Sequence, residues 1–344
     1  MLAGSTPPEL TRVTANAAQR NPMTPDFFQT SPPNPSDPAA ELRAGIAAKD
    51  SQIAPWYLYD AIGSRLFDII TMTPDYYPTR TEATILAEHL PAISEVTAKH
   101  GTIPNCSLID LGAGNCEKAP QLFPVVKPSQ YVPVDISVNY LKETVKSMQR
   151  EYTEIEMIGV GTDFSRHLVL HDKVQKERRL FFYPGSSIGN FTPSKAGLFL
   201  EGIRQQMQAD GALWIGIDLV KDKQIMERAY DDELGVTAAF NRNILRNVNN
   251  IADTDFAPAK WRHISVFNDQ ASRIEMHLEA KSAMTVNWPN GERSFAAGER
   301  ILTEVSYKYT PESFRNLLEN AGLRAIGMWT DDKQWFAMFA AVTA

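Results

Sequence analysis

The sequence SLIDLGAGN, at residues 107–115, decides the fold class of this chain. A largely apolar run ends there in two glycines separated by one residue, Gly112 and Gly114. Glycine lets the backbone bend tightly and approach a ligand closely, so a strand that ends in this way and leads into a helix is typical of nucleotide-binding α/β proteins. A single glycine turn is weak support, so the prediction depends on the sequence that surrounds it.

Four further apolar runs follow, and amphipathic segments lie between them. The runs are at 131–135, 156–160, 179–183 and 212–217, and the clearest amphipathic segments are at 138–152 and 195–207. Buried strands that alternate with amphipathic helices predict a parallel sheet covered by helices on both faces. Such a sheet binds its ligands at the carboxyl ends of the strands.

Beyond residue 220 the pattern changes to a helical segment followed by antiparallel strands. A helix is expected at 223–249 with an interruption near Gly235, strands at 263–267, 274–288 and 300–309, a helix at 311–320 and a last strand at 335–342. We therefore predict a Rossmann-like α/β core formed by residues 80–220 plus 310–344. Residues 39–79 plus 221–309 are expected to form a second, smaller α+β domain, with the ligand cleft between the two.

Proline dominates the start of the chain. Residues 1–38 hold eight of the 22 prolines, a density that opposes helix and strand pairing. We predict a disordered tail over 1–38; a tail that docks on the folded chain is the alternative.

Composition excludes several classes of protein. The net charge is -7, with 41 acidic against 34 basic residues, and no basic block offers a foothold for nucleic acid. No apolar stretch is long enough to span a membrane, and the N-terminus is not a secretory signal. Two cysteines exclude a disulfide framework, and the six histidines lack metal-ligand spacing. We expect a cytoplasmic, metal-free monomer.

Acidic residues stand at the ends of the strands that follow the glycine turn. Asp135 lies 21 residues beyond Gly114, the spacing of a carboxylate that accepts ribose hydroxyls, and Asp163 could face an adenine amino group. The third position after Gly114 is Glu117, so the pyrophosphate fingerprint is incomplete. This set favours S-adenosylmethionine over a dinucleotide; the structural alternative is a tight turn with solvent-facing aspartates.

Several longer segments carry a specific resemblance. They are YLYDAIGS (57–64), LFD (66–68), DYYPTRTE (75–82), GSSIGNFTP (185–193), DLVKD (218–222), AYDD (229–232), GVTAAFNRN (235–243), RIEM (273–276) and LTEVS (302–306). From about residue 40 onward the chain resembles the histidine-specific methyltransferases that make hercynine in the first step of ergothioneine biosynthesis. The resemblance implies three methyl transfers from S-adenosylmethionine to the α-amino nitrogen of L-histidine, without a metal.

The resemblance also implies which residues bind the amino-acid end of histidine and the cofactor. Asn190 and Tyr59 would be the catalytic residues, with Tyr230 at the substrate carboxylate and Phe67 beside the amine. Gly185 would also border the substrate. The residues implied for the cofactor are Gly112, Gly114, Lys118, Asp135 and Asp163. Structural roles are the alternatives: Asn190 as a helix cap and Phe67 as a core residue.

For the imidazole ring, the resemblance implies Glu304 and Ser306, with Tyr76 on the opposite side and Met276 against the ring. Glu304 and Ser306 are two positions apart on a predicted strand, so both side chains project from one face. A carboxylate and a hydroxyl can together engage the two ring nitrogens. The alternatives are a solvated strand face for this pair and core packing for Met276.

Three other functions remain open at this point. A methyltransferase of the same fold could act on another amine, such as an indole substrate, although Glu304 would then be poorly matched. A module that senses S-adenosylmethionine without turnover would not need Asn190, Tyr59 and Glu304. A nicotinamide dehydrogenase is disfavoured by the incomplete glycine fingerprint.

Overall fold

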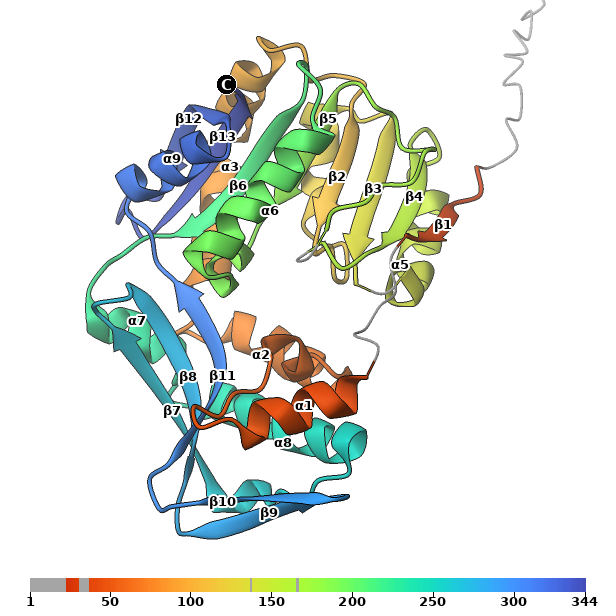
Figure 1. The fold of residues 1–344 in the computed structure, drawn as a ribbon. Coiled ribbons are helices and arrows are strands. Elements are labelled where there is room, and N and C mark those ends of the chain that lie inside the picture. The colour runs from red at the N-terminus through yellow and green to blue at the C-terminus, as the bar shows by residue number, and fades with distance from the viewer. Residues whose placement is uncertain (1–22, 31–36, 137, 165–166) are drawn as a thin grey trace, which may run out of the picture.

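The structure, a computed structural model, describes residues 23–30, 37–136, 138–164 and 167–344. Its central element is an eight-stranded sheet in the order β1-β4-β3-β2-β5-β6-β13-β12 (Figure 1). The strands are β1 (Asp26–Gln29), β2 (Ser107–Leu111), β3 (Gln130–Asp135), β4 (Glu156–Gly161), β5 (Arg179–Tyr183), β6 (Ala212–Asp218), β12 (Leu323–Thr330) and β13 (Phe336–Thr343). The first six are parallel to one another, β13 runs antiparallel to β6, and β12 runs antiparallel to β13.

Strand order reverses between β2 and β5, and Gly112 directly follows β2. The glycine turn therefore lies at the switch point of the sheet, where open α/β sheets bind ligands. The parallel sheet predicted from the alternating apolar runs is confirmed.

Helices cover both faces of this sheet, and the alternation of side chains along the strands explains why. Ile109 packs on one face with α6 (Pro193–Gln206) and α9 (Pro311–Asn320). Its neighbour Leu108 packs on the other face with α3 (Tyr77–Ala98), α4 (Phe123–Val126) and α5 (Val138–Glu151). Successive strand residues thus contribute alternately to the hydrophobic layers on the two faces of the sheet.

A second assembly lies beneath the carboxyl edge of the sheet in Figure 1. Its helices are α1 (Pro38–Ala47), α2 (Ala61–Met72), α7 (Lys223–Ala229) and α8 (Val236–Ala252). Its strands are β7 (Trp261–Asn268), β8 (Arg273–Ala280) and β11 (Arg300–Tyr307), which form an antiparallel sheet, and the hairpin β9 (Met284–Trp288) and β10 (Gly291–Phe295). Short 3₁₀ turns complete the fold: η1 (Pro55–Leu58), η2 (Ala119–Leu122), η3 (Ser187–Asn190) and η4 (Pro258–Lys260).

Elements predicted after residue 220 agree with the structure in type, except that the strand predicted over 274–288 is two strands, β8 and β9, and that two further strands were missed. The break near Gly235 separates α7 from α8, and α9 has the predicted bounds. Strands β10 and β12 were not predicted, because both contain polar or glycine residues that interrupt the apolar pattern. The division of the chain into two folding domains stays a prediction.

The prediction of a disordered tail over 1–38 is wrong for residues 26–29, which form β1; residues 1–22 and 31–36 lie outside the described residues. The prediction failed because it rested on the proline density of the whole segment, whereas residues 26–31, which include Phe27 and Phe28, contain no proline. Strand β4 receives β1 because its glycines leave room: a Cβ at Gly159 would lie 2.7 Å from the Phe27 ring, and one at Gly161 would lie 2.1 Å from Gln29 Oε1. An ion pair joins Asp26 Oδ2 to Lys173 Nζ at 2.7 Å.

We expect a chain that begins at residue 31 to be less stable than one that begins at residue 23, by about 2 kcal/mol, because two half-buried phenylalanines and one edge of the sheet are lost. Urea unfolding of the two truncated chains measures the difference. Equal free energies of unfolding would mean that β1 contributes nothing to the fold.

Candidate active site

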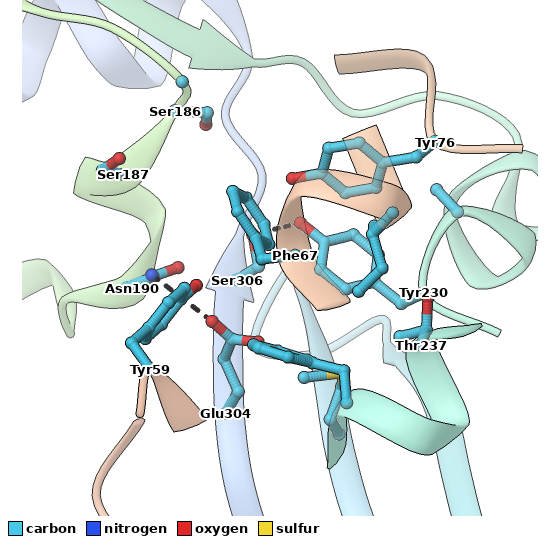
Figure 2. A pocket seen from close by; sticks show the side chains of 15 residues that line it. Tyr59, Phe67, Tyr76, Ser186, Ser187, Asn190, Tyr230, Thr237, Glu304 and Ser306 are labelled. Atoms are coloured by element: carbon cyan, nitrogen blue, oxygen red, sulfur yellow. Dashed lines mark hydrogen bonds between the residues drawn. The ribbon is translucent and has the colours of Figure 1, made fainter. Parts of the chain in front are cut away.

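A cavity of about 510 Å³, including its open mouth, lies where the carboxyl edge of the large sheet meets the second assembly. Figure 2 shows the side chains that line it. All nine residues predicted to contact the substrate are among them: Tyr59, Phe67, Tyr76, Gly185, Asn190, Tyr230, Met276, Glu304 and Ser306. The lining residues that were not predicted are Ile70, Ser186, Ser187, Ala229, Thr237 and Phe240.

Aromatic rings form one wall of the pocket. The Tyr59 ring lies edge-on to Phe67 at 5.6 Å between centroids and to Phe240 at 5.4 Å. Tyr76 continues this wall, at 6.1 Å from both Phe67 and Tyr230. Faces of aromatic rings attract cations, so this wall suits a positively charged nitrogen.

The turn before α2 fixes the position of Tyr59. Asp60 caps the helix, because its Oδ1 accepts the Gly63 N–H at 2.6 Å and the Asn243 amide at 2.7 Å. A Cβ at Gly63 would lie 1.8 Å from the Leu58 carbonyl oxygen, so only glycine fits there. Asn243 of α8, from the segment 235–243, therefore holds the turn that carries Tyr59.

Glu304 and Asn190 lie next to each other in the pocket, joined by a dashed line in Figure 2. The Asn190 amide nitrogen lies 3.5 Å from Glu304 Oε1. This hydrogen bond is long, so the carboxylate can still accept hydrogen bonds from a ligand. Asn190 ends η3, which packs closely on β11: a Cβ at Gly189 would lie 2.8 Å from the Tyr307 carbonyl oxygen. Burial raises the pKa of Glu304 to about 7, and the Lys308 ammonium opposes this only in part.

The Met276 side chain is almost fully buried, and its backbone pairs with Glu304 between β8 and β11. Met276 therefore packs beneath the same patch of the pocket as the carboxylate. Ser306 is two positions further along β11, on the same face, as the strand period requires.

Behind the pocket lies a buried ionic cluster that the sequence did not reveal. Asp218, at the end of β6, accepts the Tyr77 hydroxyl at 2.8 and 2.9 Å. Its other partners are the ammonium groups of Lys221, at 2.5 Å, and Lys308, at 2.7 Å. Burial alone would raise the pKa of Asp218, but the two lysines outweigh it and hold this pKa below its usual value. The cluster ties α3, β6 and the end of β11 together.

The predicted cofactor residues lie along the neighbouring part of the sheet edge and do not line the pocket. Gly112 and Gly114 have φ angles of 68° and 55°, the left-handed region that favours glycine. The Gly114 N–H donates to Asp135 Oδ2 at 3.1 Å, so the glycine turn and the end of β3 lie side by side. Asp163 follows the end of β4, two positions beyond Gly161.

Glu82, which was not among the predicted site residues, connects the predicted cofactor residues to the pocket. This buried carboxylate binds the Lys118 ammonium at 2.6 Å and accepts the Gly185 N–H at 2.7 Å. Lys118, on the cofactor side, is thereby held next to Gly185, which lines the pocket.

Among the described residues, no group of three or more histidine, cysteine, aspartate or glutamate side chains could hold a metal ion. Within the same ranges, no helix is both long and apolar enough to cross a membrane.

Comparison with known proteins identifies the family. A family model described as histidine-specific methyltransferase, SAM-dependent, matches residues 38–343. The chain belongs to this family. The resemblance found in the sequence segments is thus confirmed, and so is the Rossmann-like methyltransferase fold class.

Two curated relatives in this family match nearly end to end. The histidine N-alpha-methyltransferase of Mycolicibacterium smegmatis is 40% identical, over 89% of this chain and 97% of its own length. That of Mycobacterium tuberculosis is 36% identical, over 88% of this chain and 93% of its own length. The ergothioneine biosynthesis protein 1 of Neurospora crassa is 30% identical over 84% of this chain, which corresponds to 33% of that longer protein.

Among solved structures, an S-adenosylmethionine-dependent methyltransferase from Clostridium acetobutylicum has a TM-score of 0.43 at 11% identity, over 76% of this chain and 97% of that chain.

Proposed function

We propose that this chain transfers three methyl groups from S-adenosylmethionine to the α-amino nitrogen of L-histidine and so makes hercynine, the first step of ergothioneine biosynthesis. The observation that carries this proposal is the pocket itself. It combines an aromatic wall, the amide of Asn190 and the polar pair Glu304 and Ser306, the groups that the two ends of a histidine molecule need.

In this proposal the imidazole ring lies against β11. Glu304 accepts a ring N–H, Ser306 contacts the other ring nitrogen, and Met276 and Tyr76 border the ring. A charge-assisted bond to a carboxylate in a partly dry cleft is stronger than one between neutral groups. A ring N–H would also favour the ionised form of Glu304, whose raised pKa of about 7 reflects its burial.

The α-amino end lies near Asn190 and Tyr59. Methyl transfer is an in-line displacement on a sulfonium, so the amine must be neutral and held about 3–3.5 Å from the methyl carbon. The amide of Asn190 orients the amine, and the ring of Tyr59 stabilises the growing positive charge on nitrogen. The hydroxyl proton of Tyr230 is donated to Ser306, so in this proposal Tyr230 orients Ser306 and the amide of Asn190 also binds the substrate carboxylate.

S-adenosylmethionine supplies the methyl group, and the residues at the sheet edge suit it. Asp135 would accept the ribose hydroxyls beside the glycine turn, and Asp163 would face the adenine amino group. Lys118, held by Glu82 beside Gly185, lies between this edge and the pocket. Methyl donor and acceptor would therefore meet near Gly185.

An indole substrate is the second candidate, because a methyltransferase of this fold could act on another amine. The buried Glu304 disfavours it, because an indole has no acceptor to match Ser306 and fits the carboxylate poorly. A monomeric state and a cytoplasmic location stay predictions from the sequence.

Mass spectrometry of L-histidine incubated with the purified protein and S-adenosylmethionine tests the proposal. We expect mono-, di- and trimethylated histidine to appear in turn, with EDTA present throughout. Unchanged histidine after prolonged incubation with folded protein and fresh cofactor would refute the proposal, and loss of activity in EDTA would refute its metal-free part.

A further inference from the structure

Lys308 is a fully buried ammonium directly behind the pocket. Its side chain follows β11 and has 0% of its surface exposed. The Nζ atom lies 2.7 Å from Asp218 Oδ2, 2.9 Å from Ser306 Oγ and 3.0 Å from Tyr230 Oη. An ammonium has three N–H donors and no acceptor, so each of these oxygens receives one N–H and no donor remains.

A second hydrogen bond, from Tyr230, completes the set of donors around Ser306. The Tyr230 hydroxyl donates to Ser306 Oγ at 2.9 Å, the contact drawn as a dashed line in Figure 2. Ser306 Oγ therefore accepts two hydrogen bonds, one from Lys308 and one from Tyr230, and both of its lone pairs are used. Its own proton has no acceptor in the part of the chain that the structure describes, and Ser306 lines the pocket. Toward a ligand, Ser306 can only donate.

Glu304 has the opposite polarity on the same strand face. In its ionised form, which a ring N–H favours, the carboxylate only accepts, and among the described residues its one hydrogen bond comes from the Asn190 amide at 3.5 Å. The pocket thus offers a ring one acceptor and one donor, two strand positions apart. A neutral imidazole has one N–H and one bare nitrogen and matches both groups. An imidazolium would point an N–H at a hydroxyl that cannot accept it.

We propose that Lys308 is a positioning residue that sets ring specificity: by committing Ser306 to donate, it makes the pocket bind histidine with a neutral imidazole, whose N–H faces Glu304 and whose bare nitrogen faces Ser306. This inference rests on the proposed function, because it assumes that histidine is the ligand. Lys308 touches no substrate atom and acts through the two hydroxyls.

Lys221 provides a matched control within the same cluster. It binds the other oxygen of Asp218 at 2.5 Å, as Lys308 does from its own side. Lys221 donates to the Tyr77 hydroxyl at 2.7 Å and does not line the pocket. Lys308→Met and Lys221→Met therefore each remove one ammonium from Asp218, but only Lys308→Met frees Ser306.

The first measurement uses the wild-type protein, so it does not depend on whether a variant folds. The ring of L-histidine is labelled with ¹⁵N and bound in the presence of S-adenosylhomocysteine, which cannot react. At pH 6.5, where about half of free imidazole is protonated, we expect the ¹⁵N spectrum of the bound ring to report one N–H and one bare nitrogen. Two protonated ring nitrogens would overturn the inference.

The second measurement compares ligand affinities by calorimetry. Lys308→Met should weaken L-histidine at least tenfold and leave β-(2-thienyl)-L-alanine, whose ring has no nitrogen, within twofold of the wild type. Lys221→Met should leave both affinities within about threefold. Equal losses of both ligands in Lys308→Met would show a merely structural role, and an unchanged histidine affinity would also overturn the inference. A wild type that does not bind histidine would instead refute the proposed function, and this inference with it.

Discussion

Glu304→Ala is expected to weaken L-histidine binding about 10- to 100-fold, because one charge-assisted hydrogen bond in a buried site contributes roughly 1.5–3 kcal/mol. The carboxylate lines the pocket, whereas the predicted cofactor residues do not, so S-adenosylhomocysteine binding should stay within twofold. Calorimetry with each ligand measures both effects. Glu304→Gln is the matched control: it keeps the shape and an acceptor oxygen but loses the charge, so its loss of histidine affinity should be smaller.

The same variant should change ring selectivity when it is combined with Met276→Val. Met276 pairs with Glu304 across the two strands, so the double change removes a buried carboxylate and widens the pocket at one place. We expect L-tryptophan to compete with histidine in turnover by the double variant but not by the wild type. If Glu304→Ala keeps the wild-type affinity and selectivity for histidine, then Glu304 does not bind the ring.

Asp218→Asn is expected to destabilise the folded protein by about 3–5 kcal/mol, since removing one partner from a buried ion pair leaves uncompensated charge in the interior. Here two ammonium groups, Lys221 and Lys308, would lose their shared carboxylate. The Tyr77 hydroxyl would then donate to a neutral amide instead of a carboxylate, and this weaker hydrogen bond would hold α3 less firmly to the end of β6.

Chemical denaturation of Asp218→Asn and of Asp222→Ala separates this effect from the loss of an ordinary aspartate. Asp222 is exposed and caps α7 by accepting the Gln224 N–H at 2.9 Å, so its replacement should destabilise by about 1 kcal/mol. Similar losses in the two variants would mean that the buried cluster contributes no more than a helix cap.

Local sequence pattern was sufficient to predict the parallel part of the sheet from β2 to β6 and the strand face that Glu304 and Ser306 share. The strand that ends at Gly112, the helices between the apolar runs and the shared face of Glu304 and Ser306 all follow from periods of two or 3.6 residues. The resemblance then singled out side chains from distant segments, such as Tyr59 and Asn190, which the fold brings into one cavity.

Contacts between distant segments could not be predicted in this way. The register that sets Met276 opposite Glu304 depends on an irregularity in β11 between Leu302 and Glu304. Charged residues are usually exposed, so nothing local indicates that Asp218 and Lys308 are buried. Phe240 has the ordinary appearance of a core residue on an amphipathic helix, and only the packing of α8 against α2 brings it to the pocket.

Strand β1 was missed because the proline density was counted over residues 1–38 as a whole, and a short proline-free strand lies within that segment. Part of the evidence for this strand is in β4, where Gly159 and Gly161 leave room for the side chains of Phe27 and Gln29. The Gln29 side chain also donates to the Ile136 carbonyl oxygen at 3.2 Å, next to Asp135. Residues near the N-terminus therefore support the edge of the sheet where we expect the cofactor.

The most direct test of the proposed function is to locate the transferred methyl groups. L-histidine labelled with ¹⁵N at the α-amino group is incubated with the protein and with S-adenosylmethionine labelled with ¹³C at the methyl carbon, and the product is examined by NMR. We predict one final product in which three equivalent methyl carbons are coupled to the α-nitrogen and the ring nitrogens carry none. Methyl groups on a ring nitrogen, or no transfer to histidine at all, would contradict the account.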